Sequence, residues 1–557
     1  MSRTIQESQQ KFGAGDAVDF IIVGAGAAGG VIANELSAAG FRIVVLEQGP
    51  YLKEKDFTHD ELKYMFQSAM TNDYKRQPNT FRSKANDKAR VQPAVVYGRM
   101  VGGGTAHFTA NYWRFHEIDF VERTKLGPIS GTGFDDWPIT YADLEPYYTK
   151  AEWELGISGR PGTFDSWRSR PYPLPPLPVK SSGALAETGA RKLGWHAEPS
   201  PMAILSRPYR GRSGCVHCGF CEYFGCEVKA KSSTLATVIP QAEKTGRCEI
   251  RPNSYVRKIE TDVAGRVTGV TYFNSDGKES FQKARAVVLC CNGAETPRLL
   301  LMSKSNLFPN GLANSSGLVG KYLMFNAGGV ALGVFEHPLN EYKSVAVTRV
   351  IHDFYDTDPK RGFYGGGGLD TRFDVYPISY PLFGLPPQLP RWGSEFKKFV
   401  SESFTRAMYA VAHTTSLPLE TNTITLDPAV KDEWGLPALR VTYRDHPDDI
   451  KISKFLLARG MELLDAAGAT RKWSFPVVEQ TLGFHLLGTC RMGNNAKRSV
   501  INKDHRAHDV PNLFICDGSS FVTSGRGQPT CTIQALAYRA SDQIIRLAKS
   551  GEIKSAS

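Results

Sequence analysis

The feature that most constrains the fold is a glycine-rich turn between a strand and a helix in the first fifty residues. An apolar strand, the turn, a helix of small and apolar residues and a second apolar strand ending in an acid follow in order at Val18–Val23, Gly24–Gly29, Gly30–Ala39, Phe41–Leu46 and Glu47. Gly24 permits the tight turn, Gly26 lets the backbone approach a pyrophosphate, and Gly29 lets helix and strand pack closely. The phosphates would meet free N–H groups at the helix N-terminus, and Glu47 would accept hydrogen bonds from ribose hydroxyls. The pattern predicts a Rossmann-type site for an adenine dinucleotide.

Length and charge limit the remaining classes. A chain of 557 residues is too long for one Rossmann unit, so two closely connected domains are expected. No run of 18 apolar residues occurs, which predicts no membrane span, and the polar stretch Met1–Asp16 lacks the apolar core of a signal peptide. The net charge is +11, but the Lys and Arg residues are scattered, so a solvated basic surface is expected rather than a nucleic-acid partner.

Three later segments add candidate ligand-binding residues. Gly102-Gly103-Gly104 is followed by His107, Thr109 and Asn111, and successive glycines can bring bare backbone against a flat ligand. Val287–Pro297 and Asn512–Gly518, which contains Asp517, each read as a strand that ends in a turn of small or acidic residues. These segments predict one large dinucleotide-binding domain assembled from distant parts of the chain.

Together with Asp136–Ile139 and His485–Gly493, these motifs resemble the glucose–methanol–choline (GMC) flavoprotein oxidoreductases along nearly the whole chain. The resemblance implies an α/β fold with a Rossmann-type FAD-binding domain and an α+β substrate domain built on an antiparallel sheet. Within the family, Trp113-Arg114-Phe115 and Ile424–Tyr443 are similar to bacterial sugar and sugar-acid dehydrogenases, gluconate 2-dehydrogenase among them.

The expected FAD-binding domain comprises residues 15–125, 215–325 and 475–550, and the expected substrate domain comprises 126–214 and 326–474. In the substrate domain, Asn422–Leu426 and Ala438–Tyr443 alternate like antiparallel strands, and Pro447–Ala467 has the three-and-four apolar spacing of a helix.

Two residues are predicted to act on the substrate. His485 matches the family's catalytic histidine, and its ordinary pKa near ~6.5 suits a base that takes the hydroxyl proton at neutral pH. The family's second catalytic position, a His or Asn before a proline in many members, is held here by Gln528 before Pro529. Gln528 can orient the substrate oxygen or hydrogen-bond the flavin, or simply pack beside the ring.

The resemblance places the cofactor against Gly103, His107, Thr109, Asn111, Asp517 and Pro529 as well as the first glycines and Glu47. In several family members a histidine at the offset of His107 is bonded covalently to the flavin. Covalent attachment at His107 and a non-covalent histidine beside the ring are both consistent with the sequence.

Four of the ten cysteines, Cys215, Cys218, Cys221 and Cys226, lie within twelve residues. Their spacing resembles ferredoxin-type ligation of an iron–sulfur cluster, and some sugar dehydrogenases of the family carry a cluster in the equivalent region with a different spacing. Zinc, disulfides and free thiols are the alternatives.

The predicted function is FAD-dependent oxidation of an alcohol group on a sugar, sugar acid, polyol or glycoside, with electrons passed to a cytochrome, quinone or other non-oxygen acceptor. The alternatives are an oxygen-using oxidase, a non-redox lyase on the same fold, and a non-catalytic flavoprotein. The chain alone is expected in the cytoplasm, and the resemblance suggests export to the periplasm with a small partner subunit. The sequence leaves open the substrate, the acceptor and the oligomeric state.

Overall fold

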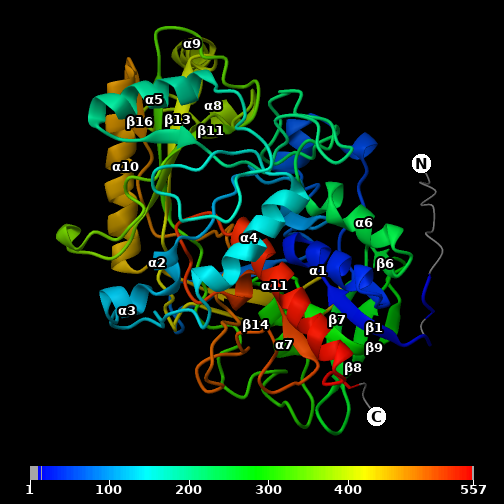
Figure 1. Cartoon of the computed structure of the whole chain (residues 1–557). Coiled ribbons are helices and arrows are strands. Elements are labelled where there is room, and N and C mark those ends of the chain that lie inside the picture. The colour runs from blue at the N-terminus through cyan, green and yellow to red at the C-terminus, as the bar shows by residue number, and fades with distance from the viewer. Residues whose placement is uncertain (1–10, 14, 555–557) are drawn as a thin grey trace.

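A seven-stranded sheet forms one half of the molecule in the computed structural model, which describes residues 11–13 and 15–554 (Figure 1). The strand order is β6-β2-β1-β9-β8-β7, and β17 also pairs with β9. The pairs among β6, β2, β1, β9 and β17 are parallel, whereas β8 pairs antiparallel with β9 and β7. The strands are β1 (Val18–Val23), β2 (Ile43–Leu46), β6 (Cys248–Arg251), β7 (Tyr255–Thr261), β8 (Val267–Phe273), β9 (Glu279–Leu289) and β17 (Leu513–Ile515).

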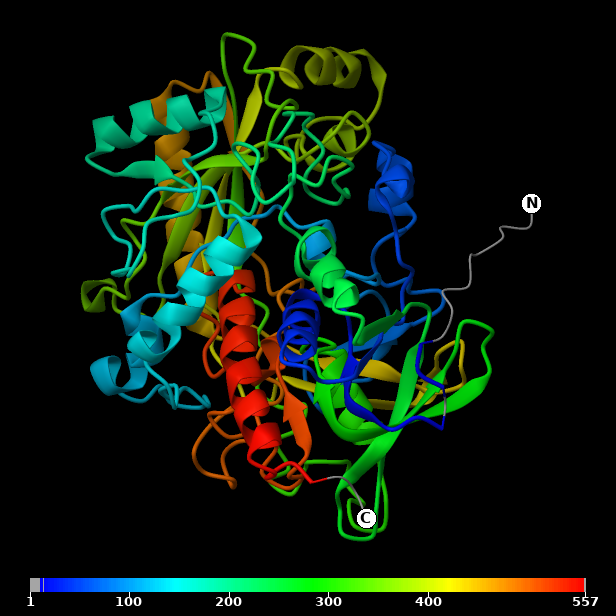
Figure 2. The ribbon, with the colours of Figure 1, turned by 45° about the vertical axis from the view of Figure 1, so that its right-hand side comes forward.

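Helices from distant parts of the chain belong to this half of the molecule. Helix α1 packs against α11 and α6, and α11 also packs against α4, so that α1 and α11 lie side by side in Figures 1 and 2. Every residue of β2 is buried, and β1 has one half-buried position, which is the continuous apolar pattern of parallel strands covered on both faces. The helices are α1 (Ala27–Ala38), α4 (Tyr141–Leu155), α6 (Val238–Lys244), α7 (Glu295–Met302) and α11 (Thr530–Lys549).

A six-stranded antiparallel sheet forms the other half, in the order β16-β10-β13-β12-β11-β5. Helices α5 (Ser181–Leu193) and α10 (Pro447–Ala467) pack on it, and α9 (Gly393–Ser403) lies near its edge (Figure 1). Ala412 packs with Ile452 and Leu456 of α10, so the alternation of a strand turns His413 to the opposite face. The strands are β5 (Ala197–Pro199), β10 (Gly328–Val334), β11 (Val347–Ile351), β12 (Gly367–Arg372), β13 (Ala407–Thr414) and β16 (Arg471–Ser474).

A small third sheet contains strands from the segments expected for both domains. Strands β14 (Thr423–Lys431) and β15 (Pro437–Thr442) pair antiparallel, as the sequence predicts, but β15 pairs with β3 (Asn79–Arg82) and does not join the six-stranded sheet. β3 pairs in turn with β4 (Arg90–Val91). Phe81, Leu439 and Val441 of these strands share an apolar cluster of their own.

The two large sheets draw their strands from the segments expected for the two domains, and the predicted helix Pro447–Ala467 is confirmed as α10. The helix expected at Gly30–Ala39 begins earlier, at Ala27. The expectation of a polar N-terminus without a signal segment concerns residues that lie mostly outside the described ones. Within the described part of the chain, no helix is both long enough and apolar enough to cross a lipid bilayer.

Candidate active site

One large cavity brings together predicted site residues from distant parts of the chain. It has about 1550 Å³ of empty space, including space open to solvent at its mouth. Phe108, Glu222, Tyr223, Asn292 and Phe484 are among the other residues that line it. Of the residues predicted to bind cofactor or substrate, its lining includes Gly24, Gly26, Glu47, Gly103, His107, Thr109, Asn111, His485, Asp517, Gln528 and Pro529. Gly29 is absent from the lining.

The glycines of the first turn divide into two roles. A Cβ on Gly29 would lie 1.9 Å from the carbonyl oxygen of Gly24, so Gly29 allows α1 to pack against the turn. A Cβ on Gly26 would meet no protein atom closer than the Cα of Gly103 at 3.9 Å, so the space beside Gly26 belongs to the cavity. Ala27 and Ala28, the first residues of α1, also line the cavity and bring the helix N-terminus to it. An anionic group is favoured at such a position.

Glu47 lies at the end of β2 with its carboxylate held by backbone. It accepts hydrogen bonds from the N–H groups of Ala25, at 3.0 Å, and Gly49, at 2.9 Å. Burial raises the pKa of Glu47 to about 7. A second cavity, with about 500 Å³ of empty space, shares Gly24 and Glu47 with the first and continues toward Ser254 and Tyr255. The two together form an elongated site of the kind that a dinucleotide requires.

An orphaned polar atom supports the fit of a flat cofactor in the large cavity. His107 lines it, and the buried Nε2 of His107 has no hydrogen-bond partner among the described residues. Burial, and then the charge of Lys231, lower the pKa of His107 to about 4, so the imidazole is neutral at pH 7. A buried ring nitrogen without a partner is costly unless a ligand engages it. The glycine cradle, Glu47 and His107 therefore fit an adenine dinucleotide that carries a ring system.

His485 is held in one tautomer by Asn326. Its Nδ1 lies 3.2 Å from Asn326 Oδ1, and Asn326 Nδ2 donates to the carbonyl of Thr414 at 3.0 Å. Because an amide oxygen only accepts, Nδ1 of His485 carries the hydrogen and Nε2 keeps its lone pair. Burial, and then His413, lower the pKa of His485 to about 4. This value replaces the ordinary one assumed from the sequence, and it leaves a neutral proton acceptor at pH 7.

Gln528 is oriented by a histidine and an aspartate from the six-stranded sheet. Gln528 Nε2 lies 3.2 Å from Nδ1 of His413, whose Nε2 lies 2.8 Å from Oδ2 of Asp370. The shorter contact to the carboxylate places the hydrogen of His413 on Nε2, although Arg372 approaches the same nitrogen at 3.1 Å. Nδ1 of His413 then accepts from the Gln528 amide, and Oε1 of Gln528 is left for a ligand.

The carboxylate of Asp370 is the ionised centre of this network. Burial opposes its ionisation, but Arg372 and His413 outweigh burial and hold the pKa of Asp370 well below its usual range. Asn111, which lines the cavity, donates from Nδ2 to the same carboxylate at 2.9 Å. Two residues predicted from the sequence, Asn111 and Gln528, are therefore joined through Asp370 and His413.

Sequence reasoning missed Asn326, Asp370 and His413, which all come from the expected substrate domain. The available signal was an ionisable side chain within a strand, Asp370 in Gly367–Arg372 and His413 in Ala407–Thr414. Such a residue indicates a polar contact, but it does not show which loop that contact reaches.

The four clustered cysteines surround a separate cavity with about 410 Å³ of empty space, which His59 and Lys231 also line. All four are free thiols, and Lys231 is buried beside them with its Nζ donating to the carbonyl of Phe224 at 2.9 Å. Burial raises the pKa of Cys221 to about 12, although Lys231 acts in the opposite direction. Burial therefore keeps Cys221 a neutral thiol at pH 7.

Comparison with known proteins shows that this chain belongs to the GMC oxidoreductase family. The two models described as GMC oxidoreductase match residues 18–324 and 418–537. A 2-methyl-1,2-propanediol dehydrogenase of Mycolicibacterium austroafricanum is 37% identical over 539 residues, which cover 95% of this chain and 96% of the relative. The fructose dehydrogenase large subunit of Gluconobacter japonicus is 30% identical, over 96% of this chain and 98% of the relative. A formate oxidase structure from Aspergillus oryzae superposes with a TM-score of 0.66 at 15% identity, over 97% of this chain and 99% of that one, which supports the fold alone.

Proposed function

The chain belongs to the GMC oxidoreductase family and is an FAD-dependent enzyme that oxidises alcohol groups, and on this premise we propose that its substrate is a small polyol or sugar. The observation that carries the proposal is the convergence of a neutral His485 and an oriented Gln528 on the cavity of Gly26 and His107. The relative at 37% identity is named for a small diol, and the relative at 30% for a sugar.

In the proposed mechanism the protein binds the alcohol and moves its proton. When bound, FAD supplies the hydride acceptor for the carbon that carries the hydroxyl. His485 takes the hydroxyl proton on Nε2, because its Nδ1–H is engaged by Asn326. Gln528 accepts from a substrate hydroxyl through Oε1, and the His413–Asp370 pair keeps the amide in that orientation. Transfer of the proton makes the alkoxide from which hydride leaves most readily.

We further propose that FAD is attached covalently at His107. The support is the buried, neutral and unpartnered Nε2 of this residue at the cavity wall. Acid-precipitated protein should then retain its yellow colour, whereas His107→Ala should release the flavin on denaturation. A colourless pellet from the parent protein would rule out the covalent link and leave FAD binding intact.

The cysteine cavity is proposed to hold an iron–sulfur cluster that passes electrons out of the flavin site. What supports this is the arrangement of four free thiols around one cavity beside the buried cation Lys231, which would offset the charge of thiolates. Protein purified without oxygen should contain iron and inorganic sulfide. Zinc alone would make the site structural, and the absence of both elements would leave free thiols.

The electron acceptor is proposed to be a cytochrome or quinone rather than oxygen. Anaerobic bleaching of the flavin by a panel of diols, polyols, sugars and sugar acids identifies the substrate class. Reoxidation by dyes without hydrogen peroxide supports a dehydrogenase, and stoichiometric peroxide would make the protein an oxidase. Turnover without flavin bleaching would indicate a lyase.

We also propose that the chain is cytoplasmic when expressed alone and is exported in its native cell with a small subunit. The support is that the relative at 30% identity is itself a large subunit. Fractionation of native cells decides the question. Activity confined to the cytosol, and unaffected by deletion of co-expressed small subunits, would contradict the export model.

A further inference from the structure

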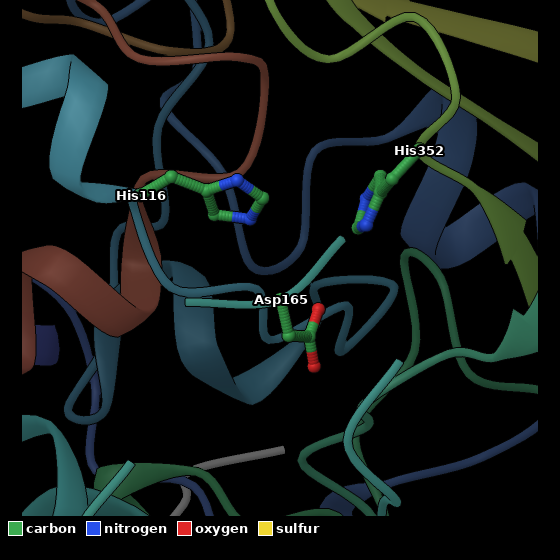
Figure 3. Close-up of side chains that lie close together, drawn as sticks. All are labelled: His116, Asp165 and His352. Atoms are coloured by element: carbon green, nitrogen blue, oxygen red, sulfur yellow. The ribbon is translucent and has the colours of Figure 1, made fainter. Parts of the chain in front are cut away.

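Two histidines and an aspartate from three separate parts of the chain converge behind the wall of the active site. His116 precedes α2 (Glu117–Phe120), Asp165 lies in the loop after α4, and His352 follows β11. One potential ligand atom from each lies within 4.8 Å of the other two. Figure 3 shows the three side chains pointing toward a shared space, and all three line a cavity with about 270 Å³ of empty space.

One buried nitrogen at this cavity has no hydrogen-bond partner among the described residues. This nitrogen is Nε2 of His352, a residue that is 5% exposed. Leaving such a nitrogen unpaired costs roughly 1–3 kcal/mol. A ligand in the cavity would remove that penalty, so the orphaned nitrogen points to an occupant.

Asp165 is available to that occupant. One carboxylate oxygen accepts from the N–H of Gly162 at 3.0 Å. The guanidinium of Arg168 forms a long ion pair with the same oxygen at 3.9 Å, beyond hydrogen-bond distance. Arg168 is engaged instead by Glu152, at 3.0 Å, and by the hydroxyl of Tyr172, at 2.7 Å. The carboxylate therefore retains lone pairs that face the two imidazoles.

The electrostatics suit a cation. Both imidazoles are buried, and a metal ion binds the neutral form of the ring. Besides Arg168, the cavity is lined by one more basic side chain, Arg114, which is paired with Glu145 at 3.1 Å and Glu152 at 2.8 Å. Its charge is therefore already neutralised.

We propose that His116, Asp165 and His352 bind one Zn²⁺ ion, or a divalent transition metal of similar preference, as a structural clamp. Two imidazole nitrogens and a carboxylate oxygen are a donor set that Zn²⁺ accepts with metal–ligand distances of about 2.0–2.2 Å. Two ligand atoms on one tetrahedral ion are then roughly 3.3 Å apart. Binding would bring the three atoms, which now lie within 4.8 Å of one another, to this separation, and water would complete the coordination.

The ion would join the six-stranded sheet to the segment that lines the active site. Trp113 packs edge-to-face on His352, with ring centroids 4.7 Å apart, and on His413, with centroids 5.4 Å apart. The metal site and the Gln528-orienting histidine therefore contact the same tryptophan. The role is structural, since none of the three ligands lines the large cavity.

The test is Zn²⁺ binding by the metal-depleted full-length holoprotein, measured by calorimetry and by the thermal unfolding temperature. The parent protein should bind about one equivalent and unfold at higher temperature with Zn²⁺ present. Asp165→Asn keeps the side-chain shape and an acceptor for Gly162, and should weaken binding by more than the roughly 10–100-fold that loss of an outer-shell partner costs. His352→Gln should do the same, and His337→Gln, at an exposed histidine, should bind like the parent.

The cysteine cavity is a competing zinc site, and Co²⁺ distinguishes the two. Co²⁺ held by imidazoles and a carboxylate lacks the intense thiolate charge-transfer band that cysteine ligation produces. The proposal is supported if the parent binds Co²⁺ without this band and Asp165→Asn does not bind it. Absence of binding in the parent, or binding that Asp165→Asn and His352→Gln leave unchanged, would overturn it.

Discussion

Replacing Asn326 with glycine should slow proton removal by His485 without removing the base itself. Asn326 adopts φ +56°, a left-handed conformation that glycine adopts without the strain that alanine would carry. The substitution deletes the amide that contacts Nδ1 of His485 at 3.2 Å and the carbonyl of Thr414 at 3.0 Å. His485 is then free to adopt the tautomer that carries its hydrogen on Nε2. In this tautomer Nε2 cannot accept the substrate proton.

The expected size of the effect follows from the lost hydrogen bond. A net contribution of about 0.5–1.5 kcal/mol corresponds to a roughly 2- to 13-fold lower rate at 1.36 kcal/mol per factor of ten. The unpaired carbonyl of Thr414 should lower the free energy of unfolding by about 1–3 kcal/mol. The rate and the stability therefore change together, and a control has to separate them.

Anaerobic stopped-flow measurement of flavin reduction gives the rate directly. The control is Asn422→Gly, which also removes a buried amide, one that donates to the carbonyl of Arg444 at 2.9 Å. This variant should lose stability but reduce the flavin at the parent rate. A parent-like rate in Asn326→Gly would refute the tautomer argument, and a loss above about 10²-fold would mean that Asn326 acts on the substrate itself.

Further substitutions and conditions test the rest of the site. Gly26→Ala should abolish FAD retention while the apoprotein keeps its unfolding temperature, because the added Cβ would enter the cavity and lie no closer than 3.9 Å to a protein atom. Gly29→Ala should instead fail to fold, since its Cβ would lie 1.9 Å from the carbonyl oxygen of Gly24. The flavin-reduction rate should be constant from neutral pH down to about 5 and fall below about 4, because His485 accepts a proton only when neutral and its pKa is lowered to about 4; a fall centred near ~6.5 would show that His485 is solvated in the working enzyme. Asp370→Asn should weaken substrate binding more than it slows flavin reduction, and unchanged binding would remove the His413–Asp370 pair from the orientation of Gln528.

The parts of the fold that could be predicted from the sequence rest on local patterns. The Gly24–Gly29 turn, the strand before it and the helix after it are neighbours in the chain, so spacing alone specifies their contacts. The recurrence of apolar residues at three and four predicts helix α10 at its observed bounds. Gly26 and Glu47 line the cavity for the same local reason.

The site residues and strand pairings that the sequence does not predict depend on contacts between segments far apart in the chain. Asp370 and His413 are 43 positions apart and reach Gln528 only because β12 and β13 pair antiparallel in one register. The pKa of His485 depends on burial by segments far from it in sequence, and no local pattern encodes that burial. The sequence predicts β14 and β15 as strands, but β3, the second partner of β15, lies more than 300 residues earlier.

Anaerobic flavin bleaching by a small diol, compared between the parent protein and His485→Ala in one stopped-flow experiment, tests whether His485 is the base that starts alcohol oxidation. We expect that both proteins retain FAD, that the diol bleaches the parent flavin, and that the variant is slower by about 10²–10⁴-fold, the range for loss of a general base. A variant that bleaches at the parent rate at neutral pH, or a parent flavin that no diol, polyol or sugar bleaches, would contradict this expectation.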